Sequence, residues 1–400
     1  MAGEERVQHH LVARSEDAQF RHHAATILIA RFLVTRFPRT IPPAPMRRLN
    51  AAVVVALAFA GCEHSAPFAG PETGSDRPFA GGSPRRITFN LGNDRAPAWL
   101  PDGSGFWYSF ERVDRADHDR CLALLPPDGG RIVRMLCDRI PAADDSTDAW
   151  TEPAIDAAGR IAYVASSSRV GDVAPRAGAL VLATAPALTS DRVVATLPYL
   201  GSDQAFRDVA QLRWLGSDAL VYVAQRVGYV APCRGCALDT VRTGVELATL
   251  DLRAAAPSPV VLPGTQNASS LGTGESPDVI YYTLGGDSRV FRRELSSGAD
   301  SVVHDFASAG IARDVQVAGR RLVAVVGGNV QFAFDSVLGY LVQRDGGGML
   351  HLVDLSSGLD SAVSAGAQLF RRPALSASGN RLVAEAVVGR SADLWEFELP

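Results

Sequence analysis

Residues 95–108 have the sequence Arg-Ala-Pro-Ala-Trp-Leu-Pro-Asp-Gly-Ser-Gly-Phe-Trp-Tyr. A short segment ends at Trp99, a Pro-Asp-Gly turn follows at 101–103, and an apolar segment begins at Phe106. Proline fixes the backbone at the start of a turn, and glycine accepts the positive φ that many turns require. The stretch therefore predicts two β-strands joined by a tight turn.

This strand–turn–strand pattern recurs along the chain, as in repeat proteins. A second piece also repeats, because residues 294–303 and 354–363 share the sequence Leu-Ser-Ser-Gly after an acidic residue. Combining the two pieces gives units of four strands. Six such units predict an all-β protein, a six-bladed β-propeller of four-stranded antiparallel blades. The copies of the first pattern lie at 95–108, 152–163, 209–223, 276–283, 312–326 and 372–384.

The last unit has no fourth strand after the apolar segment 393–399. An unused strand-like segment, 86–90, precedes the first unit. We expect this N-terminal strand 86–90 to pair with the C-terminal strand 393–399 and to close the ring, which would remove long exposed strand edges. The propeller domain is accordingly expected to span residues 86–400.

The combination of Pro-Ala-Trp or Pro-Ala-Leu with a following glycine turn, at 97–103 and 373–379, resembles the TolB-type propeller repeats of exported bacterial proteins. The resemblance extends over roughly 86–399, and the copy at 276–283 departs most from it. It implies a six-bladed propeller; five and seven blades are the alternatives. Members of this family mostly bind proteins or peptides, and some precede a hydrolase domain, so the resemblance implies binding without naming a partner.

The segment 46–61 has the pattern of a bacterial signal peptide. Met46 is followed by two arginines and by an apolar run that ends before Cys62. This run is shorter than the about 20 residues that span a bilayer as a helix. Residues 59–62, Phe-Ala-Gly-Cys, resemble the lipobox of bacterial lipoproteins, which implies a lipid on Cys62. The alternatives are an ordinary secretory signal and a buried core segment.

Two further segments flank the signal peptide. Residues 1–45 precede it, so we expect them to be a mis-assigned upstream extension with Met46 as the true start; a genuine disordered extension is the alternative. Residues 62–85 comprise the lipidated cysteine and a flexible tether rich in glycine, proline and serine. Glu63, after the cysteine, resembles a sorting signal for the outer membrane. We therefore expect an exported outer-membrane lipoprotein that faces the periplasm or the cell surface and contacts the membrane through its lipid alone.

The composition excludes several classes of protein. Of the 400 residues, 47% are hydrophobic and 20% are charged, which is enough apolar material for a large core and excludes global disorder. The 39 basic and 43 acidic residues are scattered, without the basic stripe of a nucleic-acid binder. Residues 1–61 hold 8 arginines and 4 acidic residues, so the remainder has 31 basic and 39 acidic residues and a net charge of −8.

Four cysteines remain after Cys62, an even number that suits an exported chain. Cys121 and Cys137 flank a segment with a turn at 127–130. With the turn at that position the two cysteines lie opposite each other on paired strands, which predicts a disulfide bond. Two free buried thiols are the alternative.

The other pair, Cys233 and Cys236, has the spacing Cys-x-x-Cys. Attachment of haem would require histidine at the next position, where the chain has Ala237, and a zinc site would require a second pair of cysteines. A redox pair would normally begin a helix, whereas this pair follows Pro232. We expect a local structural disulfide, with a redox role as the alternative.

Three connections between the second and third strands of a unit are long, at 112–120, 226–242 and 327–347. In a propeller these connections lie on one face. Long loops in compact domains are usually functional, and aromatic and arginine side chains are enriched where proteins bind partners. In the alternative, the aromatic side chains pack the loops onto the body. The expected binding face includes Arg226, Tyr229, Arg234, Phe332, Phe334, Tyr340 and Arg344.

No catalytic residues are predicted. The chain has no Gly-x-Ser-x-Gly motif and no glycine-rich phosphate loop, and the histidines after residue 61 lack the spacing of metal ligands. The paired histidines at 9–10 and 22–23 are set aside with the upstream extension. We expect no metal and no cofactor, and we favour a monomeric, non-enzymatic propeller that binds a protein, peptide or glycan of the cell envelope and no nucleic acid. The alternatives are a lyase or glycoside-active propeller with its site at the mouth of the central channel, and a purely structural envelope protein.

Overall fold

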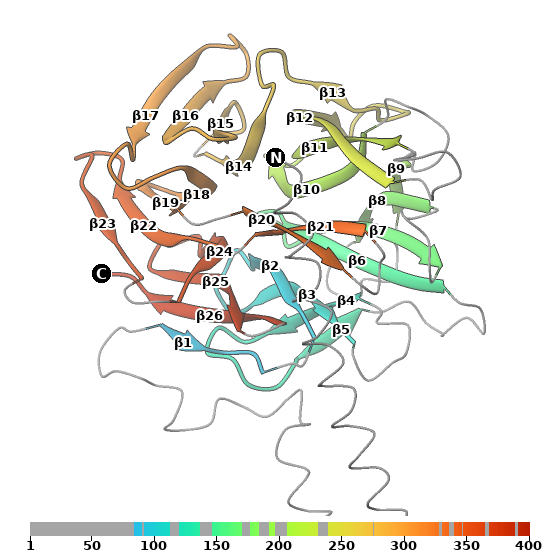
Figure 1. Ribbon diagram of the computed structural model, residues 1–400, viewed down its shortest axis with the longest axis horizontal. Helices are drawn as coiled ribbons and strands as arrows, with labels where there is room; N and C mark the ends of the chain where they lie inside the picture. The colour runs from blue at the N-terminus through green and yellow to red at the C-terminus, as the bar shows by residue number, and fades with distance from the viewer. Residues whose placement is uncertain are drawn as a thin grey trace, which may run out of the picture. The chain divides into compact units, whose positions relative to one another are not determined.

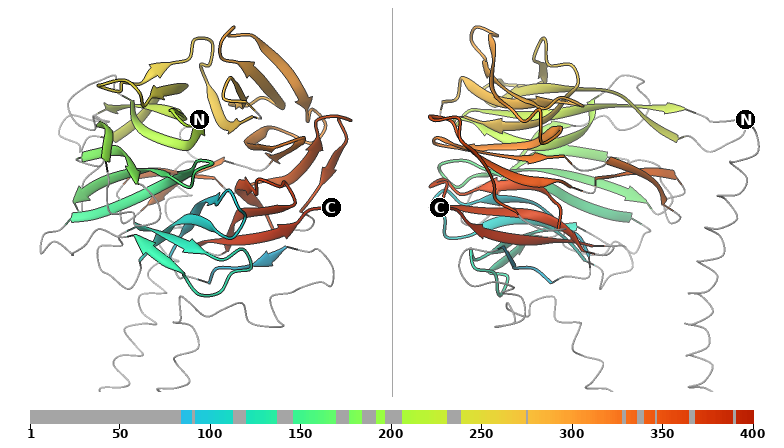
Figure 2. Two further views of the ribbon diagram at one scale, coloured as in Figure 1. Left: turned by 180° about the vertical axis from the view of Figure 1, so that it is seen from behind. Right: turned by 60° about the vertical axis from the view of Figure 1, so that its left-hand side comes forward.

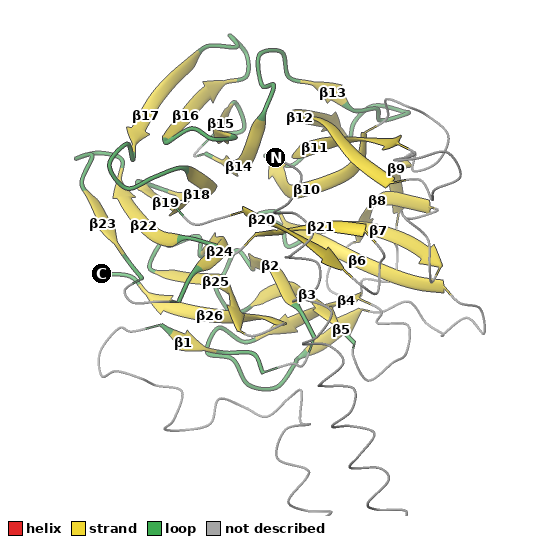
Figure 3. Cartoon of the chain, in the orientation of Figure 1, coloured by secondary structure: helices red, strands yellow, loops and turns green. Residues whose placement is uncertain are grey.

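β-Strands and the turns between them make up the described part of the chain, with no helix among the described residues (Figure 3). This confirms the all-β prediction from short apolar segments bounded by glycine turns. No helix that could cross a membrane occurs in the part of the chain that the structure describes. The computed structural model describes residues 84–89, 92–112, 120–136, 146–169, 177–183, 192–196, 206–230, 239–274, 276–327, 330–335, 340–345, 347–364, 368–388 and 391–400.

The predictions for residues 1–83 lie outside the described residues. They concern the upstream extension 1–45, the signal peptide 46–61, Cys62 and most of the tether. All described residues belong to a single unit, residues 65–400.

Four sheets contain four antiparallel strands each. Three of them follow chain order from the inside outwards, and the fourth takes its outermost strand from the N-terminal end of the described chain. The first sheet has β10 (Phe206–Leu215), β11 (Ala219–Val230), β12 (Asp239–Asp251) and β13 (Val260–Val261). The second has β14 (Ala268–Thr273), β15 (Val279–Leu284), β16 (Arg289–Glu294) and β17 (Asp300–Asp305). The third has β18 (Ala312–Ala318), β19 (Arg321–Val326), β22 (Met349–Asp354) and β23 (Asp360–Ala362). The fourth has β24 (Phe370–Leu375), β25 (Arg381–Val388), β26 (Ser391–Glu398) and β1 (Arg85–Arg86).

A further sheet contains eight strands. Its strands pair antiparallel within β2–β5 and within β6–β9, and a single parallel pair, Arg120 with Ala149, joins the two parts. A separate hairpin is formed by β20 (Val330–Asp335) and β21 (Tyr340–Asp345). The eight strands are β2 (Asp94–Trp99), β3 (Phe106–Glu111), β4 (Arg120–Leu125), β5 (Arg134–Leu136), β6 (Ser146–Ile155), β7 (Ile161–Arg169), β8 (Ala177–Ala183) and β9 (Arg192–Thr196).

The sheets are arranged around a common axis (Figures 1 and 2). The first strands of the units, β2, β6, β10, β14, β18 and β24, contact one another in this order, and β24 also contacts β2. Antiparallel four-stranded sheets around an axis are the architecture of a β-propeller. Four of the sheets are separate four-stranded units, so the count of six blades stays a prediction at this point.

The second strand of a unit is buried on both faces because it lies between two neighbouring sheets. In β3, Phe106 packs in a cluster with Leu394 of β26, while the next residue, Trp107, packs in a different cluster with Tyr163 of β7. A strand with a sheet on each side requires apolar residues at successive positions rather than at alternate ones. The continuous apolar run after each turn of the repeat has this origin.

The N-terminal strand closes the ring of sheets. Arg85 and Arg86 of β1 pair antiparallel with Glu396 and Trp395 of β26, and the N–H of Ile87 donates to the carbonyl of Leu394 at 2.9 Å. The predicted pairing of 86–90 with 393–399 is confirmed, although the strand itself begins one residue earlier and ends at Arg86. The sheet β24–β26 therefore obtains its fourth strand from a distant part of the chain.

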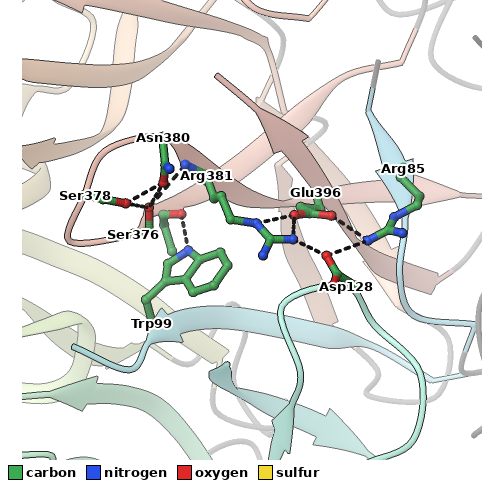
Figure 4. Close-up of polar contacts among 9 residues, drawn as sticks. Arg85, Trp99, Asp128, Ser376, Ser378, Asn380, Arg381 and Glu396 are labelled. Atoms are coloured by element: carbon green, nitrogen blue, oxygen red, sulfur yellow. Dashed lines mark hydrogen bonds and ion pairs between the residues drawn. The ribbon is translucent and has the colours of Figure 1, made fainter. Parts of the chain in front are cut away.

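A cluster of charges stabilises this closure (Figure 4). Glu396 is 4% exposed and accepts hydrogen bonds from Arg85 Nη2 at 2.7 Å and from Arg381 Nε at 2.6 Å. Asp128, in the turn between β4 and β5, contacts the same two guanidinium groups from the neighbouring sheet. The hydrogen bond from Arg381 lowers the pKa of Asp128. Trp99 Nε1 donates to the carbonyl of Ala374 at 2.9 Å beside this cluster.

Replacing Glu396 should destabilise the domain far more than replacing Asp128. Glu396→Gln leaves two partly buried guanidinium groups without their shared carboxylate, which should lower the free energy of unfolding by about 3 kcal/mol. The side chain of Asp128 is 70% exposed, so Asp128→Asn should cost less than about 1 kcal/mol. Urea denaturation of both variants measures the difference; equal losses would show that the closure does not depend on Glu396.

Asp393 gives this region a dependence on pH. Its side chain is fully buried, and burial raises its pKa to about 6 although the ion pair with Arg86 at 3.0 Å opposes the shift. The carboxyl group of Asp393 thus binds its proton more tightly in the folded state than in the unfolded state. Its contribution to the free energy of unfolding is present at low pH and is lost as pH rises through about 6.

We therefore expect the stability of the protein to fall between about pH 4 and pH 7 relative to that of Asp393→Asn. One pKa unit corresponds to about 1.4 kcal/mol, so the two profiles should diverge by about 2–3 kcal/mol. The measurement is the free energy of unfolding of both proteins across this range. Parallel profiles would contradict the assignment to Asp393.

Candidate binding site around the central channel

Each first strand has a shift in register with its second strand. Five of these shifts coincide with a non-glycine residue at positive φ, a conformation that such residues rarely adopt. A β-bulge of this kind re-aims the side chain at its position. The five residues, with their φ values, are Ala96 (52°), Glu152 (53°), Gln211 (52°), Asp314 (49°) and Arg372 (46°).

The side chain at the bulge of one first strand binds the backbone of the next. The N–H of Gln211 donates to Glu152 Oε2 at 2.6 Å, and the N–H of Arg372 donates to Asp314 Oδ2 at 2.9 Å. Gln211 Oε1 in turn accepts from the N–H of Leu271 at 2.7 Å. These bonds connect β6 to β10, β10 to β14, and β18 to β24.

Further contacts cross the axis. Gln211 Nε2 donates to Asp314 Oδ1 at 2.6 Å, and the guanidinium group of Arg372 forms an ion pair with Glu152. Burial is the largest single effect on the pKa of Arg372 and lowers it. The surrounding carboxylates together outweigh burial, so the pKa is raised. Burial lowers the pKa of Arg213 to about 10 in spite of the carboxylates of Glu152 and Asp314. The negative charges of Glu152 and Asp314 therefore balance the positive charges of Arg213 and Arg372 near the axis.

The four side chains Glu152, Gln211, Asp314 and Arg372 are called the axial ring below. The space that they enclose with their neighbours measures about 10 Å³, which is room for about one water molecule. No substrate fits into the channel at this level. A ligand on the axis would have to bind above the ring.

The channel mouth is the end of the channel at which the first strands begin, and it carries several arginines. Arg371 Nε donates to Glu385 Oε2 at 2.7 Å, and Arg95 Nη2 donates to Asn93 Oδ1 at 3.1 Å. The pKa of Arg95 is lowered to about 9, first by burial and then by the positive charges of Arg120 and Arg371, while Glu385 opposes the shift. Arg95, Arg120 and Arg371 therefore bring positive charges together at the mouth next to β2 and β24, beside the carboxylate of Glu385.

An open depression of about 510 Å³ lies on the same face as the channel mouth. Its lining combines the turn between β15 and β16 with the connections that lead into β14 and β18, and includes Asn267, residues 284–288 and Ile311. The N–H of Asn267 donates to the carbonyl of Val245 in β12, and the N–H of Gly327 donates to the carbonyl of Ile311, both within 2.9 Å. The depression thus lies between the bases of two long hairpins.

The first of these hairpins corrects the prediction of a long loop at 226–242. β11 continues to Val230 and β12 begins at Asp239, with Tyr229 paired to Thr240. Arg226 and Tyr229 therefore lie on a strand, and Arg234 lies outside the described residues. The prediction was wrong because the β-branched residues around position 227 continue the strand beyond the point where Pro232 and Gly235 suggested a loop.

The second hairpin replaces much of the loop predicted at 327–347. β20 and β21 pair with each other over their whole length, with Phe332 opposite Gln343, Phe334 opposite Leu341, and Asp335 opposite Tyr340. Arg344 is paired in the same hairpin, opposite Gln331. Both hairpins project from the ends at which β10 and β18 begin, so they share one face, called the hairpin face below (Figure 2). In the connection 112–120, residues 113–119 lie outside the described residues.

Cys121 is buried and takes part in a disulfide bond. Its expected partner Cys137, and the pair Cys233 and Cys236, lie outside the described residues. No group of three or more histidine, cysteine, aspartate or glutamate side chains among the described residues could hold a metal ion.

The axial ring is not among the site residues predicted from the sequence. Its members occupy the same place in the repeat, directly before a proline or an apolar residue such as Pro153, Leu212, Val315 and Pro373. Polar residues at one position of successive repeats were the available signal. What the sequence could not show is that the position has positive φ and faces the axis.

No family model matches the chain, and no curated protein matches it either. Solved structures do match: a gluconolactonase from Xanthomonas campestris has a TM-score of 0.50 at 13% identity, covering 80% of this chain and 90% of its own. The chain has a β-propeller fold. TolB from Acinetobacter baumannii matches with a TM-score of 0.43 at 12% identity, over 90% of this chain and 71% of its own. The propeller domain of the Trilobed protease from Pyrococcus furiosus matches with a TM-score of 0.44 at 9% identity, over 77% of this chain and 96% of its own. At these identities the likeness extends to the fold alone.

The axial ring should behave as one energetic unit. Glu152→Gln keeps an acceptor for Gln211 but removes the charge that faces Arg372, and Arg372→Met removes the partner. Each single variant should lose stability, and the double variant should lose less than their sum by about 1–3 kcal/mol. A double-mutant cycle in urea measures this coupling, and strictly additive losses would show that the two groups are independent.

Proposed function

We propose that the protein is an exported, lipid-anchored, six-bladed β-propeller that binds a protein, peptide or glycan of the cell envelope on its hairpin face. The six first strands that contact one another around the axis support the blade count. So does the single residue pair that joins β2–β5 to β6–β9, since each part has the strand order of a separate blade. In this proposal the protein is a monomer, faces the periplasm or cell surface, and holds Cys121 paired with Cys137.

One observation carries the binding proposal. The depression of about 510 Å³ opens on the hairpin face, and hydrogen bonds tie two of its edges to the bases of the β11–β12 and β20–β21 hairpins. A concave surface of this size between projecting elements can contact an extended ligand on several sides. Loops and hairpins on a rigid scaffold are also the usual place for recognition.

The axial ring favours a surface binder over an enzyme whose substrate enters the channel. Its charges are paired with one another, and it leaves room for about one water molecule. The second candidate is an enzyme with its site at the channel mouth. The observation that favours it is the convergence of Arg95, Arg371 and Glu385 from three strands above the ring.

Removal of the β20–β21 hairpin tests the binding proposal. β20 and β21 pair with each other alone among the described strands, so joining Gly327 to Gly347 through a two-residue turn should leave the sheet β18–β19–β22–β23 intact. The control shortens the connection between β12 and β13 at residues 254–257, at the opposite ends of the strands.

We expect the parent protein to retain an envelope ligand in affinity capture, and the hairpin variant to retain at least about tenfold less, a loss typical of removing an interface hot spot. The control should capture as much as the parent. Equal capture by all three proteins would overturn the binding face. The mass of the N-terminal peptide from membrane-extracted protein tests the anchor, because an unmodified Cys62 would exclude the lipoprotein.

A further inference from the structure

Arg95 is a cation whose hydrogen-bonding groups are incompletely used. Its Nη2 donates to the side-chain oxygen of Asn93, a neutral group, at 3.1 Å. Its Nε is buried and has no hydrogen-bond partner among the described residues. A guanidinium group has five N–H donors, and inside a protein it is normally matched by a carboxylate.

The nearby carboxylates are already engaged. Glu385 is fully buried; its Oε1 accepts from the N–H of Ala96 and its Oε2 from Arg371 Nε, each at 2.7 Å. Glu111 accepts hydrogen bonds at its Oε2 from the backbone and the side chain of Asn93. Neither carboxylate can turn to Arg95 without breaking these bonds.

Arg120 adds a further positive charge at the same place. It begins β4, opposite Glu111 in the β3–β4 pair, and it is partly exposed. Its guanidinium group makes no hydrogen bond or ion pair with the other residues that the structure describes. Together with Arg95 and Arg371 it places three guanidinium groups at the mouth, against Glu385 and Glu111. The lowered pKa of Arg95, caused by burial and by these two cations, agrees with an excess of positive charge.

This local charge is opposite to that of the chain as a whole, which is −8 without residues 1–61. A general attraction of anions to the protein surface is therefore not expected, and an anion would be held by the mouth itself. Below the mouth the axial ring closes the channel, so a ligand that reaches Arg95 does not come through the ring.

We propose that the channel mouth beside Arg95, Arg120 and Arg371 is a binding site for an oxyanion, a carboxylate or phosphate group carried by the ligand. The guanidinium fork of Arg95 donates to two oxygens of such a group, and Arg120 adds a second cation from the open side. The site rests on the proposed function, for which it names the ligand chemistry: an acidic sugar, peptide or phosphate-bearing molecule, with its charged group at the mouth and the remainder across the hairpin face.

The test uses small anions as probes: glucuronate for the carboxylate, inorganic phosphate for the phosphate, and glucose as the neutral control. Binding to the whole protein is measured by calorimetry at constant low ionic strength. We expect glucuronate or phosphate to bind and glucose not to bind. The anion that binds more tightly identifies the ligand group as a carboxylate or a phosphate. Binding should weaken as salt is added.

Arg95→Met should lower the affinity for the anion by about 10- to 100-fold, the effect of losing charge-assisted hydrogen bonds. Arg120→Met should lower it by a smaller factor. The matched control is Arg253→Met: Arg253 is exposed, pairs with Asp251, and lies in the connection between β12 and β13, away from the mouth. It should bind the anion as the parent does.

Thermal denaturation separates a binding role of Arg95 from a structural one. Without an anion, Arg95→Met should be at least as stable as the parent, because the variant lacks an unmatched buried cation. The anion should raise the melting temperature of the parent but not that of the variant. A folded Arg95→Met variant that is less stable than the parent without anion, and that still gains stability from the anion, would show that Arg95 serves the fold and would overturn the proposal. If Arg95→Met does not fold, the affinity of Arg120→Met for the anion tests the proposal instead: a reduced affinity supports the site, and the affinity of the parent overturns it.

The proposal also fails if neither anion binds more tightly than glucose, or if both arginine variants bind as the parent does. The variant without the β20–β21 hairpin separates this failure from failure of the proposed function, since it should lose the envelope ligand and keep the small anion. If Arg95→Met loses the small anion but captures the envelope ligand normally, the anion site is not part of recognition, and only the inference fails.

Discussion

The structure depends on how buried N–H groups at the bulges of the first strands are satisfied. A bulge withdraws an N–H from the sheet, and a buried donor without a partner costs free energy comparable to a lost hydrogen bond. Glu152 and Asp314 supply the acceptors for Gln211 and Arg372 on the following first strand. In these cases one unit completes the backbone of its successor, and Glu385 does the same for Ala96, where the last sheet meets the first. These bonds make the backbone of one unit depend on the side chains of another, so they favour a closed ring over an open row of sheets.

The parts of the fold that depend on local patterns were predictable. The Pro-Asp-Gly turn, the apolar run from Phe106 and the unused segment after Arg85 all act through short-range preferences, so the strands and the closure on β26 followed from them. The hairpin at 226–242 was missed, because turn residues outweighed a strand pattern that continues through Tyr229. The axial ring was also missed, since its bonds join residues 58 to 220 positions apart and depend on backbone angles that composition does not record.

The two ends of the channel have different tasks. The axial ring closes the channel below the mouth. On the opposite face, at the outer strands, the turn with Asp128 and the carboxylate of Glu396 hold the closure together. Charges at that end are shared among several partners, as expected for groups that serve stability. Arg95 at the mouth has no such set of partners. A buried cation that lacks a matching carboxylate, at the rim of a channel, is a candidate for binding an anionic ligand.

The β20–β21 hairpin has a consequence for how such a protein can change over time. Its strands pair with each other and with no other described strand, so its backbone pairing is independent of the sheets of the body. Selection for a new ligand could therefore act on this hairpin while the bulges and the closure stay as they are. The sheets of the propeller can stay unchanged while the sequence of the hairpin varies. The hairpin is therefore a suitable position for grafting foreign binding sequences.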